Sequence, residues 1–505
     1  MELVRTARTR ALWTSDSAIL LYLAGATLLF IVAMGGRYGF HRDELATLDD
    51  AHHLAWGYVA YPPVTPFFGR LALLTFGASV AGFRFFAALA AVTSILLTGL
   101  MARELGGGRR AQLLAAFAAM PFALGCGSLM QYVAFDCLAW VATAYFFVRL
   151  CNSEDARWWL AIGGTIGLGM LTKYSMVFCV AGIAVGVVVT RLRRHLTGKW
   201  LWLGAGCALL IFLPNLLWQW RHDFISLEFL QHIHARDVRI GRTKDFIPDQ
   251  LKMELFGLPL ALAGLLFLFL SPKAGRWRAL PWLYVVPFVL FLLAHGRGYY
   301  LAPAYAVLFA AGAVWMEDMF RRWRPRWSRT GYAIAAVLLL ADVALVSAVV
   351  LPAGPVGSAS WNFAVKQNED LAEEVGWPEL VETIARVRDS LPQSDRARLG
   401  ILAGNYGEAG AINLYGPAHG LPRAICGTNS FWERGYGDPP PETVIVVGFD
   451  REFVEHHFES AEVVARVTNR HGVANEETTQ RPEIFLCRGL RGGWAEFWKT
   501  FQRFG

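Results

Sequence analysis

The sequence lacks the cysteine and glycine patterns that mark metal and nucleotide sites. Its seven cysteines do not stand at the spacing of metal ligands. Five of them fall in or beside apolar runs, where cysteine behaves as a small hydrophobic residue: Cys126, Cys137, Cys151, Cys179 and Cys207. The C-terminal region has no glycine-rich phosphate loop, so it gives no basis for a nucleotide site. Its two cysteines, Cys426 and Cys487, can pair only if this region faces an oxidising compartment.

The chain also lacks the low apolar content of a soluble domain. Hydrophobic residues make up 55% of it, and its mean hydropathy is +0.37. Soluble domains average roughly 45–50% even on a count that includes glycine. Runs of about 20 apolar residues, long enough to cross a bilayer, recur through the first 350 residues or so. The first run, 17–35, has no convincing cleavage site, so we expect a retained membrane anchor.

Nucleic-acid binding is excluded by where the positive charge lies. The net charge is +7, but the basic residues cluster in alternate short loops between apolar runs. One such cluster contains Arg191, Arg193, Arg194 and Lys199. This alternation is the positive-inside pattern, which predicts that these loops and the N-terminus are cytoplasmic. The basic residues therefore indicate membrane lipids as partners.

The apolar runs predict about eleven transmembrane helices and interfacial helices between them. The expected spans are about 17–36, 80–102, 111–126, 134–150, 157–172, 175–190, 200–217, 252–270, 280–294, 301–316 and 331–351. A second interfacial helix is expected at about 65–78. With the N-terminus inside, the last span delivers the C-terminus to the outer face. Residues 1–351 are therefore predicted to form the membrane domain, with a first outer loop at 37–66.

From about Pro352 the composition changes to acidic residues and Gly and Pro turns. Short runs of β-like character occur at about 399–402, 443–447, 461–467 and 484–486, with helical patterns at 379–390 and 451–458 between them. We expect residues 352–505 to form a small extracytoplasmic α/β domain.

The loop at 37–66 holds an acidic group that is unusual between two apolar runs. Asp43 and Glu44 begin a helical pattern in which Leu45 and Leu48 share one face and Asp50 lies on another. This pattern predicts an amphipathic helix lying on the membrane surface. The two acids are candidates for catalysis. The alternative is that they only favour the helix N-terminus through its dipole, which contributes about 0.3–1 kcal/mol.

Further polar residues fall at the outer ends of spans that are distant in the sequence. Asp136 lies inside an apolar run, where a carboxylate needs a partner or a ligand. Lys173 and Arg297 lie in outer turns, and Tyr299 and Tyr300 follow Arg297. Several such groups on one leaflet predict a shared polar cavity. The alternatives are snorkelling for Lys173 and an interfacial aromatic belt for the tyrosines.

The order of these motifs resembles the bacterial branch of the protein O-mannosyltransferase superfamily, whose members have the GT-C fold. That branch includes the lipid A aminoarabinose transferase. The motifs are Arg42-Asp43-Glu44, Gly57-Tyr58, Pro62-Pro63, Gln131-Tyr132 with Asp136, Leu171-Thr172-Lys173-Tyr174 and Gly298-Tyr299-Tyr300-Leu301-Ala302-Pro303. The run 405–411, NYGEAGA, is also similar to family members that have an outer domain of this kind.

This resemblance implies a transferase of the bacterial inner membrane that takes a sugar from a polyprenyl-phosphate donor on the periplasmic face. Asp43 matches the family's catalytic carboxylate, Glu44 completes the acidic pair and Asp136 matches the second acidic position. The lipid A enzyme has a lysine just before the proline, where this chain has Tyr61. We therefore expect Lys173 and Arg297 as substitutes.

The chemistry of such a transfer fits the same residues. A carboxylate must take the acceptor proton, and cations must hold the departing phosphate. The predicted base is Asp43, and Asp136 orients the acceptor or a cation. The predicted phosphate-binding residues are Tyr61, Lys173, Arg297, Tyr299 and Tyr300. A single displacement would invert the anomeric centre.

Two rival readings and the metal question stay open at this stage. A transporter or lipid-linked sugar flippase would also bury charges among many spans. A scaffold with an outer binding domain would leave Asp136 unexplained. The loop at 218–250 carries His222, His232 and His234 near acidic residues, but their spacing is too loose to name a metal site. A divalent metal is compatible with acidic outer loops and is not required by them.

Overall fold

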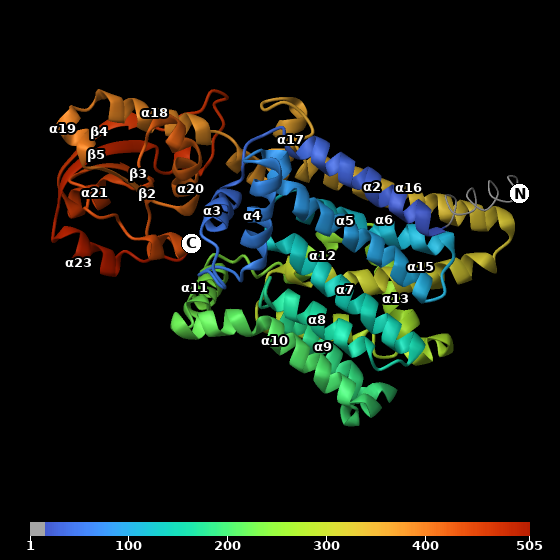
Figure 1. Cartoon of the computed structure of the whole chain (residues 1–505). Helices are drawn as coiled ribbons and strands as arrows, with labels where there is room; N and C mark the ends of the chain where they lie inside the picture. Colours follow the sequence, from blue (N-terminus) through green and yellow to red (C-terminus); the bar gives the residue numbers. More distant parts are fainter. Residues whose placement is uncertain (1–15) are drawn as a thin grey trace, which may run out of the picture. The chain divides into compact units, whose positions relative to one another are not determined.

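The computed structural model describes residues 16–505, which divide into two compact units (Figure 1). Within the described residues, the first unit comprises 16–33, 84–222 and 234–351, and the second comprises 34–83, 223–233 and 352–505. The second unit therefore includes the first outer loop, which the sequence prediction had grouped with the membrane domain. The loop is linked to the C-terminal residues by hydrogen bonds between residues far apart in the sequence, such as Asp43 with Tyr406 and Asp50 with Arg434.

The first unit is built of helices. They are α2 (Asp16–Gly35), α5 (Val80–Glu104), α6 (Arg109–Gly127), α7 (Tyr132–Ser153), α8 (Trp158–Met170), α9 (Met176–Val189), α10 (Lys199–Arg221), α12 (Phe246–Met253), α13 (Leu258–Leu270), α14 (Trp282–Leu293), α15 (Tyr305–Arg321) and α16 (Pro325–Val350), where α2 and α5 run into the second unit. Short 3₁₀ turns join some of them: η1 (Arg191–Thr197), η2 (Pro272–Trp277) and η3 (Gly298–Ala304).

All eleven predicted spans fall on helical segments, but not all of these are long enough to span a bilayer alone. Among residues 16–505, seven helices are long and apolar enough to cross a membrane, or up to nine if each of two bent pairs is one span. The bent pairs are α9 with η1 and α12 with α13, with bends of 103° and 106°. Helices α8 and α14 are apolar but only 13 and 12 residues long.

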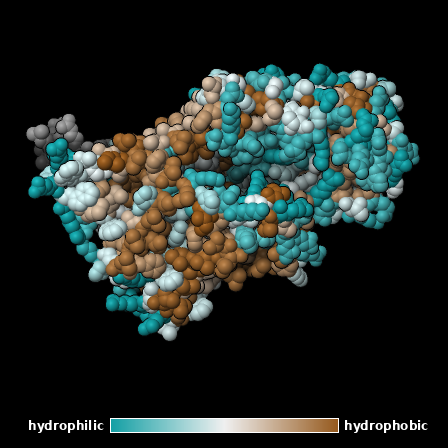
Figure 2. All heavy atoms as spheres, turned by 180° about the vertical axis from the view of Figure 1, so that it is seen from behind, coloured by the Kyte–Doolittle hydropathy of each residue, from teal (hydrophilic) through white to brown (hydrophobic). Residues whose placement is uncertain are grey.

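The exposed side chains of the helices support a lipid environment. Large apolar side chains on their outer faces are exposed, including Leu29, Leu210, Leu270 and Leu293, each at least 70%. Figure 2 shows hydrophobic residues, in brown, gathered over the helical part of the chain. An exposed apolar surface of this extent is stable in lipid and costly in water.

Glycines let neighbouring helices of the first unit approach closely. A Cβ added to Gly163 in α8 would lie 2.0 Å from the backbone oxygen of Gly204 in α10. A Cβ added to Gly312 in α15 would lie 1.9 Å from the oxygen of Leu260 in α13. Small residues at helix interfaces are the usual means of close packing in a membrane.

The second unit contains a five-stranded sheet in the order β2-β1-β3-β5-β4. Its strands are β1 (Leu399–Ala403), β2 (Ala424–Ile425), β3 (Thr443–Val447), β4 (Phe458–Arg466) and β5 (Glu483–Leu490). Strands β2, β1 and β3 are parallel, and β5 and β4 are antiparallel to their neighbours. The predicted α/β domain and its four strands are confirmed. Only β2 was not predicted, because two residues carry no alternation pattern.

Helices complete the unit. They are α3 (Arg42–His52), α4 (Val64–Phe76), α11 (Ile225–Arg239, of which 225–233 belong here), α17 (Ala359–Gln367), α18 (Trp377–Ser390), α19 (Gln393–Ala397), α20 (Tyr406–Tyr415), α21 (Arg451–His457), α22 (Glu476–Thr479) and α23 (Gly493–Thr500). The 3₁₀ turns are η4 (Glu369–Glu374), η5 (Gly416–His419) and η6 (Asn429–Arg434).

The core of the second unit follows from strand alternation. Val444 and Val446 point to the same face of β3, where they meet Phe485 of β5 and Phe497 and Trp498 of α23. Burying such side chains stabilises the unit by about 1.5–3 kcal/mol each. Cys487 lies in this core as a free thiol, and Cys426 is also free and buried, so no disulfide joins them.

Candidate active site

The predicted site residues fall into two groups, one in each unit. Asp43, Glu44 and Tyr61 belong to the second unit. The first unit contains the other five: Asp136, Lys173, Arg297, Tyr299 and Tyr300. The expectation that all of them line one polar cavity stays a prediction.

The start of α3 is fixed by a capping box. His41 is the N-cap residue, and its Nδ1 accepts a hydrogen bond from the backbone N–H of Asp43 at 3.2 Å. Glu44 reaches back to accept the backbone N–H of His41 at 2.9 Å. This exchange satisfies backbone donors that a helix start leaves unpaired. Glu44 is completely buried, so its part in this structure is to stabilise the helix start.

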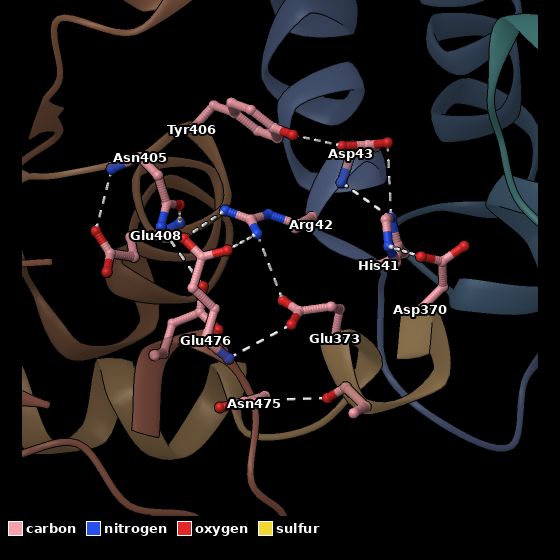
Figure 3. Close-up of polar contacts among 12 residues, drawn as sticks. His41, Arg42, Asp43, Asp370, Glu373, Asn405, Tyr406, Glu408, Asn475 and Glu476 are labelled. Atoms are coloured by element: carbon pink, nitrogen blue, oxygen red, sulfur yellow. Dashed lines mark hydrogen bonds and ion pairs between the residues drawn. The ribbon is translucent and has the colours of Figure 1, made fainter. Parts of the chain in front are cut away.

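Asp43 differs from Glu44 in having an accessible carboxylate. Its side chain is 44% exposed, and its Oδ1 accepts a hydrogen bond of 2.8 Å from the hydroxyl of Tyr406 in α20 (Figure 3). Beside it, the Arg42 guanidinium donates to Glu476, lies 3.8 Å from Glu373 and stands over the Tyr406 ring at 5.4 Å. Asp43 is therefore an accessible carboxylate held by a network of polar side chains.

The other end of α3 is also held by the second unit. Arg434 forms an ion pair with Asp49 at 3.0 Å and donates to Asp50 at 2.5 Å, and Asn413 donates to Asp49 at 2.7 Å. The hydroxyl of Tyr61 donates to Asp50 at 2.6 Å. Burial raises the pKa of Asp50, against the opposing effect of Arg434. Burial together with Asp50 raises the pKa of Tyr61 well above its usual value, so Tyr61 stays a donor.

These contacts correct one expectation about α3. The acids near its C-terminal end are not exposed at a membrane surface, because Asp49 and Asp50 are buried against Arg434, whereas Asp43 at its start stays accessible. Leu45 and Leu48 of the apolar face are buried as well. The sequence pattern of an amphipathic helix was correct, but protein covers part of its acidic face. It also follows that the Tyr61 hydroxyl serves Asp50 in this structure, and its predicted contact with phosphate stays a prediction.

In the first unit, Lys173 lies in the turn between α8 and α9, surrounded by aromatic rings. Its Nζ is 3.9 Å from the ring centre of Tyr300, 4.9 Å from Tyr132 and 5.2 Å from Tyr299. Such cation–π contacts hold an ammonium group without neutralising its charge. Within residues 16–505, no carboxylate forms an ion pair with Lys173. The turn thus presents a held positive charge.

Asp136 and Arg297 lie near this turn and have partners of their own. Asp136, in the first turns of α7, is 4% exposed, and its Oδ2 accepts a hydrogen bond of 3.4 Å from Ser175. Its Oδ1 is buried without a hydrogen-bond partner. Arg297 donates from Nε to Asp237 at 2.6 Å, and Asp237 is itself buried. A guanidinium has five N–H donors, so this ion pair leaves others for a ligand.

The histidine-rich loop does not form a metal site in this structure. His222 stacks on Trp218 with ring centres 3.9 Å apart, and His232 lies against the ring of Phe504. Asp237 is occupied by Arg297. In the part of the chain that the structure describes, no group of three or more His, Cys, Asp or Glu side chains is arranged to hold a metal ion.

Sequence reasoning did not find several residues that hold the site. Tyr406 lies 363 residues after Asp43, and Arg434 lies 384 residues after Asp50. Glu373 and Glu476 have no local pattern that links them to Arg42. The one available signal was the run 405–411, which the resemblance singled out without assigning it a role.

Comparisons with known proteins agree with this fold. Residues 60–218 match the family model described as dolichyl-phosphate-mannose-protein mannosyltransferase. A comparison with curated protein sequences gives no match.

Solved structures match over nearly the whole chain. The crystal structure of ArnT from Cupriavidus metallidurans bound to undecaprenyl phosphate has a TM-score of 0.58 at 15% identity, covering 92% of this chain and 97% of that one. Its apo state gives 0.55 at 14% identity, covering 93% and 97%. The archaeal oligosaccharyltransferase AglB from Archaeoglobus fulgidus, in complex with an inhibitory peptide and a dolichol-phosphate, gives 0.46 at 13%, covering 84% and 69%.

The fold class expected from the sequence is therefore confirmed, and the match of residues 60–218 agrees with the expected family resemblance. The chain is a multi-pass membrane protein with the GT-C fold of the ArnT structures.

Proposed function

We propose that this protein is a glycosyltransferase that moves a sugar from a polyprenyl-phosphate carrier to an acceptor on the periplasmic face of the bacterial inner membrane. The observation that carries the proposal is the Lys173 turn, where an ammonium without an ion-pair partner among residues 16–505 is held by the rings of Tyr132, Tyr299 and Tyr300. The bound undecaprenyl phosphate of the matching ArnT structure supports a carrier of this class.

In this proposal the first unit binds the phosphate of the donor. When the sugar leaves its carrier, negative charge develops on the phosphate oxygens, and fixed positive groups stabilise that charge. Lys173 supplies one such group, and Arg297, oriented by Asp237, supplies a second through its remaining N–H donors. Tyr299 and Tyr300 keep the lysine side chain in place.

The second unit supplies the base. Of the acids in α3, Glu44, Asp49 and Asp50 are buried and paired, whereas the Asp43 side chain is 44% exposed. Asp43 takes the proton of the acceptor hydroxyl or amine as that group attacks the anomeric carbon, and the carbon–phosphate oxygen bond breaks. One displacement of this kind inverts the anomeric centre. Asp136, with one buried oxygen still unpaired, orients the acceptor or a cation.

The test is sugar transfer in proteoliposomes that contain a radiolabelled polyprenyl-phosphate sugar pool. Wild type is compared with Asp43→Asn and with Asp395→Asn, an acid of the second unit away from α3. We expect label to reach an acceptor with wild type and Asp395→Asn, and a loss of about 10²–10⁴-fold with Asp43→Asn. Full transfer by Asp43→Asn would contradict the assignment of the base. Label that crosses the bilayer on an unchanged carrier would instead indicate a flippase.

A further inference from the structure

The residue that touches the proposed base comes from the C-terminal sequence, in the run NYGEAGA. Tyr406 is the first residue of α20, and its hydroxyl donates to Asp43 at 2.8 Å. Figure 3 shows the two side chains pointing toward each other from facing helices. The contact needs the tyrosine hydroxyl, since a phenylalanine ring in the same place has no donor.

The position of Tyr406 is fixed by the residues on both sides of it. Asn405 caps α20 by accepting the backbone N–H of Glu408 at 2.9 Å. Glu408 in turn accepts the backbone N–H groups of Gly404 at 2.9 Å and Asn405 at 3.2 Å. This reciprocal capping orders the helix start. It places the Tyr406 side chain at a defined point of the first turn.

The helix that carries Tyr406 is also packed tightly on α3. A Cβ added to Gly410 would lie 2.6 Å from the backbone of Leu45, so the two helices touch almost backbone to backbone. At the other end of this contact, Asn413 of α20 donates to Asp49 of α3 at 2.7 Å. Two fixed points therefore set the distance between Tyr406 and Asp43.

The ring of Tyr406 is held from its other side by Arg42. The guanidinium stands over the ring at 5.4 Å and is anchored by Glu476 and Glu373, which come from α22 and η4. Burial, and after it the Asp43 carboxylate, raises the pKa of Tyr406 well above its usual value. The hydroxyl therefore keeps its proton and remains a donor at any ordinary pH.

We propose that Tyr406 is a positioning residue for the reaction, which orients the Asp43 carboxylate for removal of the acceptor proton. This inference rests on the proposed role of Asp43 as the base. A hydrogen bond to Oδ1 fixes the plane of the carboxylate, while a carboxylate has about four acceptor sites and can still take a proton. Correct orientation of a reacting group accounts for much of the rate of an enzyme, and small displacements reduce it strongly.

The test compares Tyr406→Phe with wild type in the full-length protein, using the same transfer assay at varied donor concentration. We expect kcat to fall by roughly tenfold or more while KM for the donor changes by less than about twofold, because the phosphate site lies in other residues. The matched control is Tyr436→Phe, a tyrosine of the second unit that stacks on Trp494 and has no contact with α3. Its kcat should match that of wild type.

Two further variants separate this inference from the proposed function. In an Asp43→Asn background, Tyr406→Phe should have no further effect on the residual rate, since the carboxylate that it orients is gone. Tyr406→His offers an N–H donor and should recover part of the kcat that Tyr406→Phe loses. If Tyr406→Phe does not fold, Tyr406→His is measured in its place. Wild-type kcat in folded Tyr406→Phe would overturn the positioning role while leaving Asp43 as the base. Full transfer by Asp43→Asn would instead overturn the assignment of Asp43 as the base, on which this inference rests.

Discussion

At the scale of single residues, the acids of the first loop are distinguished by what each one touches. Glu44 accepts a backbone N–H, Asp49 and Asp50 form ion pairs with Arg434, and Asp43 accepts from a neutral phenol. Asp49 and Asp50 are buried in ion pairs with the Arg434 guanidinium, whereas the Asp43 side chain is 44% exposed. Asp43 therefore stands apart from its neighbours in the sequence by its environment, and its residue type alone does not show this.

Lys173 gives a prediction at this scale. Lys173→Gln keeps much of the side-chain length but removes the charge, so we expect kcat/KM for a polyprenyl-phosphate donor to fall by roughly 10–100-fold, or about 1.4–2.8 kcal/mol of transition-state stabilisation. Lys173→Arg should retain part of the activity. Lys199→Gln is the control, because Lys199 also lies over an aromatic ring, that of Trp200. An unchanged rate with Lys173→Gln would remove it from the phosphate site.

Buried glutamates near Arg42 give a pH prediction. Burial raises the pKa of Glu477 to about 8, with repulsion from Glu373 and Glu408 adding to it, and burial raises that of Glu408 to about 7. A raised folded-state pKa means that the folded protein holds its protons more strongly than the unfolded chain. The contribution of these groups to the free energy of unfolding is fully present below pH 4.5, which is the pKa of a glutamate in the unfolded chain. It is lost as the pH rises toward about 8.

The measurement is thermal unfolding of the purified protein between pH 5.5 and 9. We expect the transition of the second unit to move to lower temperature as pH rises, and Glu477→Gln to reduce that dependence because a neutral amide does not titrate. Glu455→Gln, an exposed acid of α21, should leave the dependence as in wild type. A transition that rises with pH in wild type would contradict the prediction.

At the scale of helices and strands, apolar runs locate the helices, and close approach of backbones decides which helices pair. Apolar runs were enough to locate the helical segments, because a chain in lipid has to satisfy its backbone hydrogen bonds within each segment. They did not predict the bends of 103° and 106° at α9–η1 and α12–α13, since a bend does not change the apolar character of a segment. The pairing of α8 with α10 depends on Gly163 and Gly204, where no Cβ fits.

Two adjacent glycines test this packing. Gly163→Ala places a methyl group against the backbone of Gly204, which cannot move aside as a side chain would, so we expect a loss of roughly 1–3 kcal/mol and a lower yield of folded protein. Gly164→Ala is the matched control, because nothing lies within 4 Å of the added Cβ. It should be neutral or slightly stabilising, as expected for alanine in a helix. Equal effects of the two would argue against a close α8–α10 contact.

At the scale of the whole molecule, features that depend on local sequence patterns were predictable, and features that depend on contacts between distant residues were not. The membrane class and the α/β region were predictable, because charge spacing, apolar length and strand alternation are local, and the roles of the site residues stay predictions. The grouping of residues 34–83 with 352–505 was not predictable, because it depends on pairs such as Asp43 with Tyr406 and Asp50 with Arg434 that are hundreds of residues apart. For the same reason the sequence could not show that protein covers part of the acidic face of α3.

The orientation inferred from the basic loops gives a prediction for the whole chain. A cysteine placed at Glu455 in α21 should react with a membrane-impermeant maleimide in intact spheroplasts, because we expect the second unit outside. One placed at Gly275 in η2, next to basic Lys273 and Arg276, should react only after permeabilisation. Both positions are exposed, so access from one side decides the result. The opposite pattern would reverse the topology.

The distance in sequence between α3 and its partners also has a consequence for how the protein is made. Asp50 is synthesised 384 residues before Arg434. At about 5–20 residues per second, this interval lasts roughly 20–80 s. During that time two neighbouring carboxylates have left the ribosome without the guanidinium that pairs with them. A chain that stops before Arg434 therefore lacks the ion-pair partner of Asp49 and Asp50.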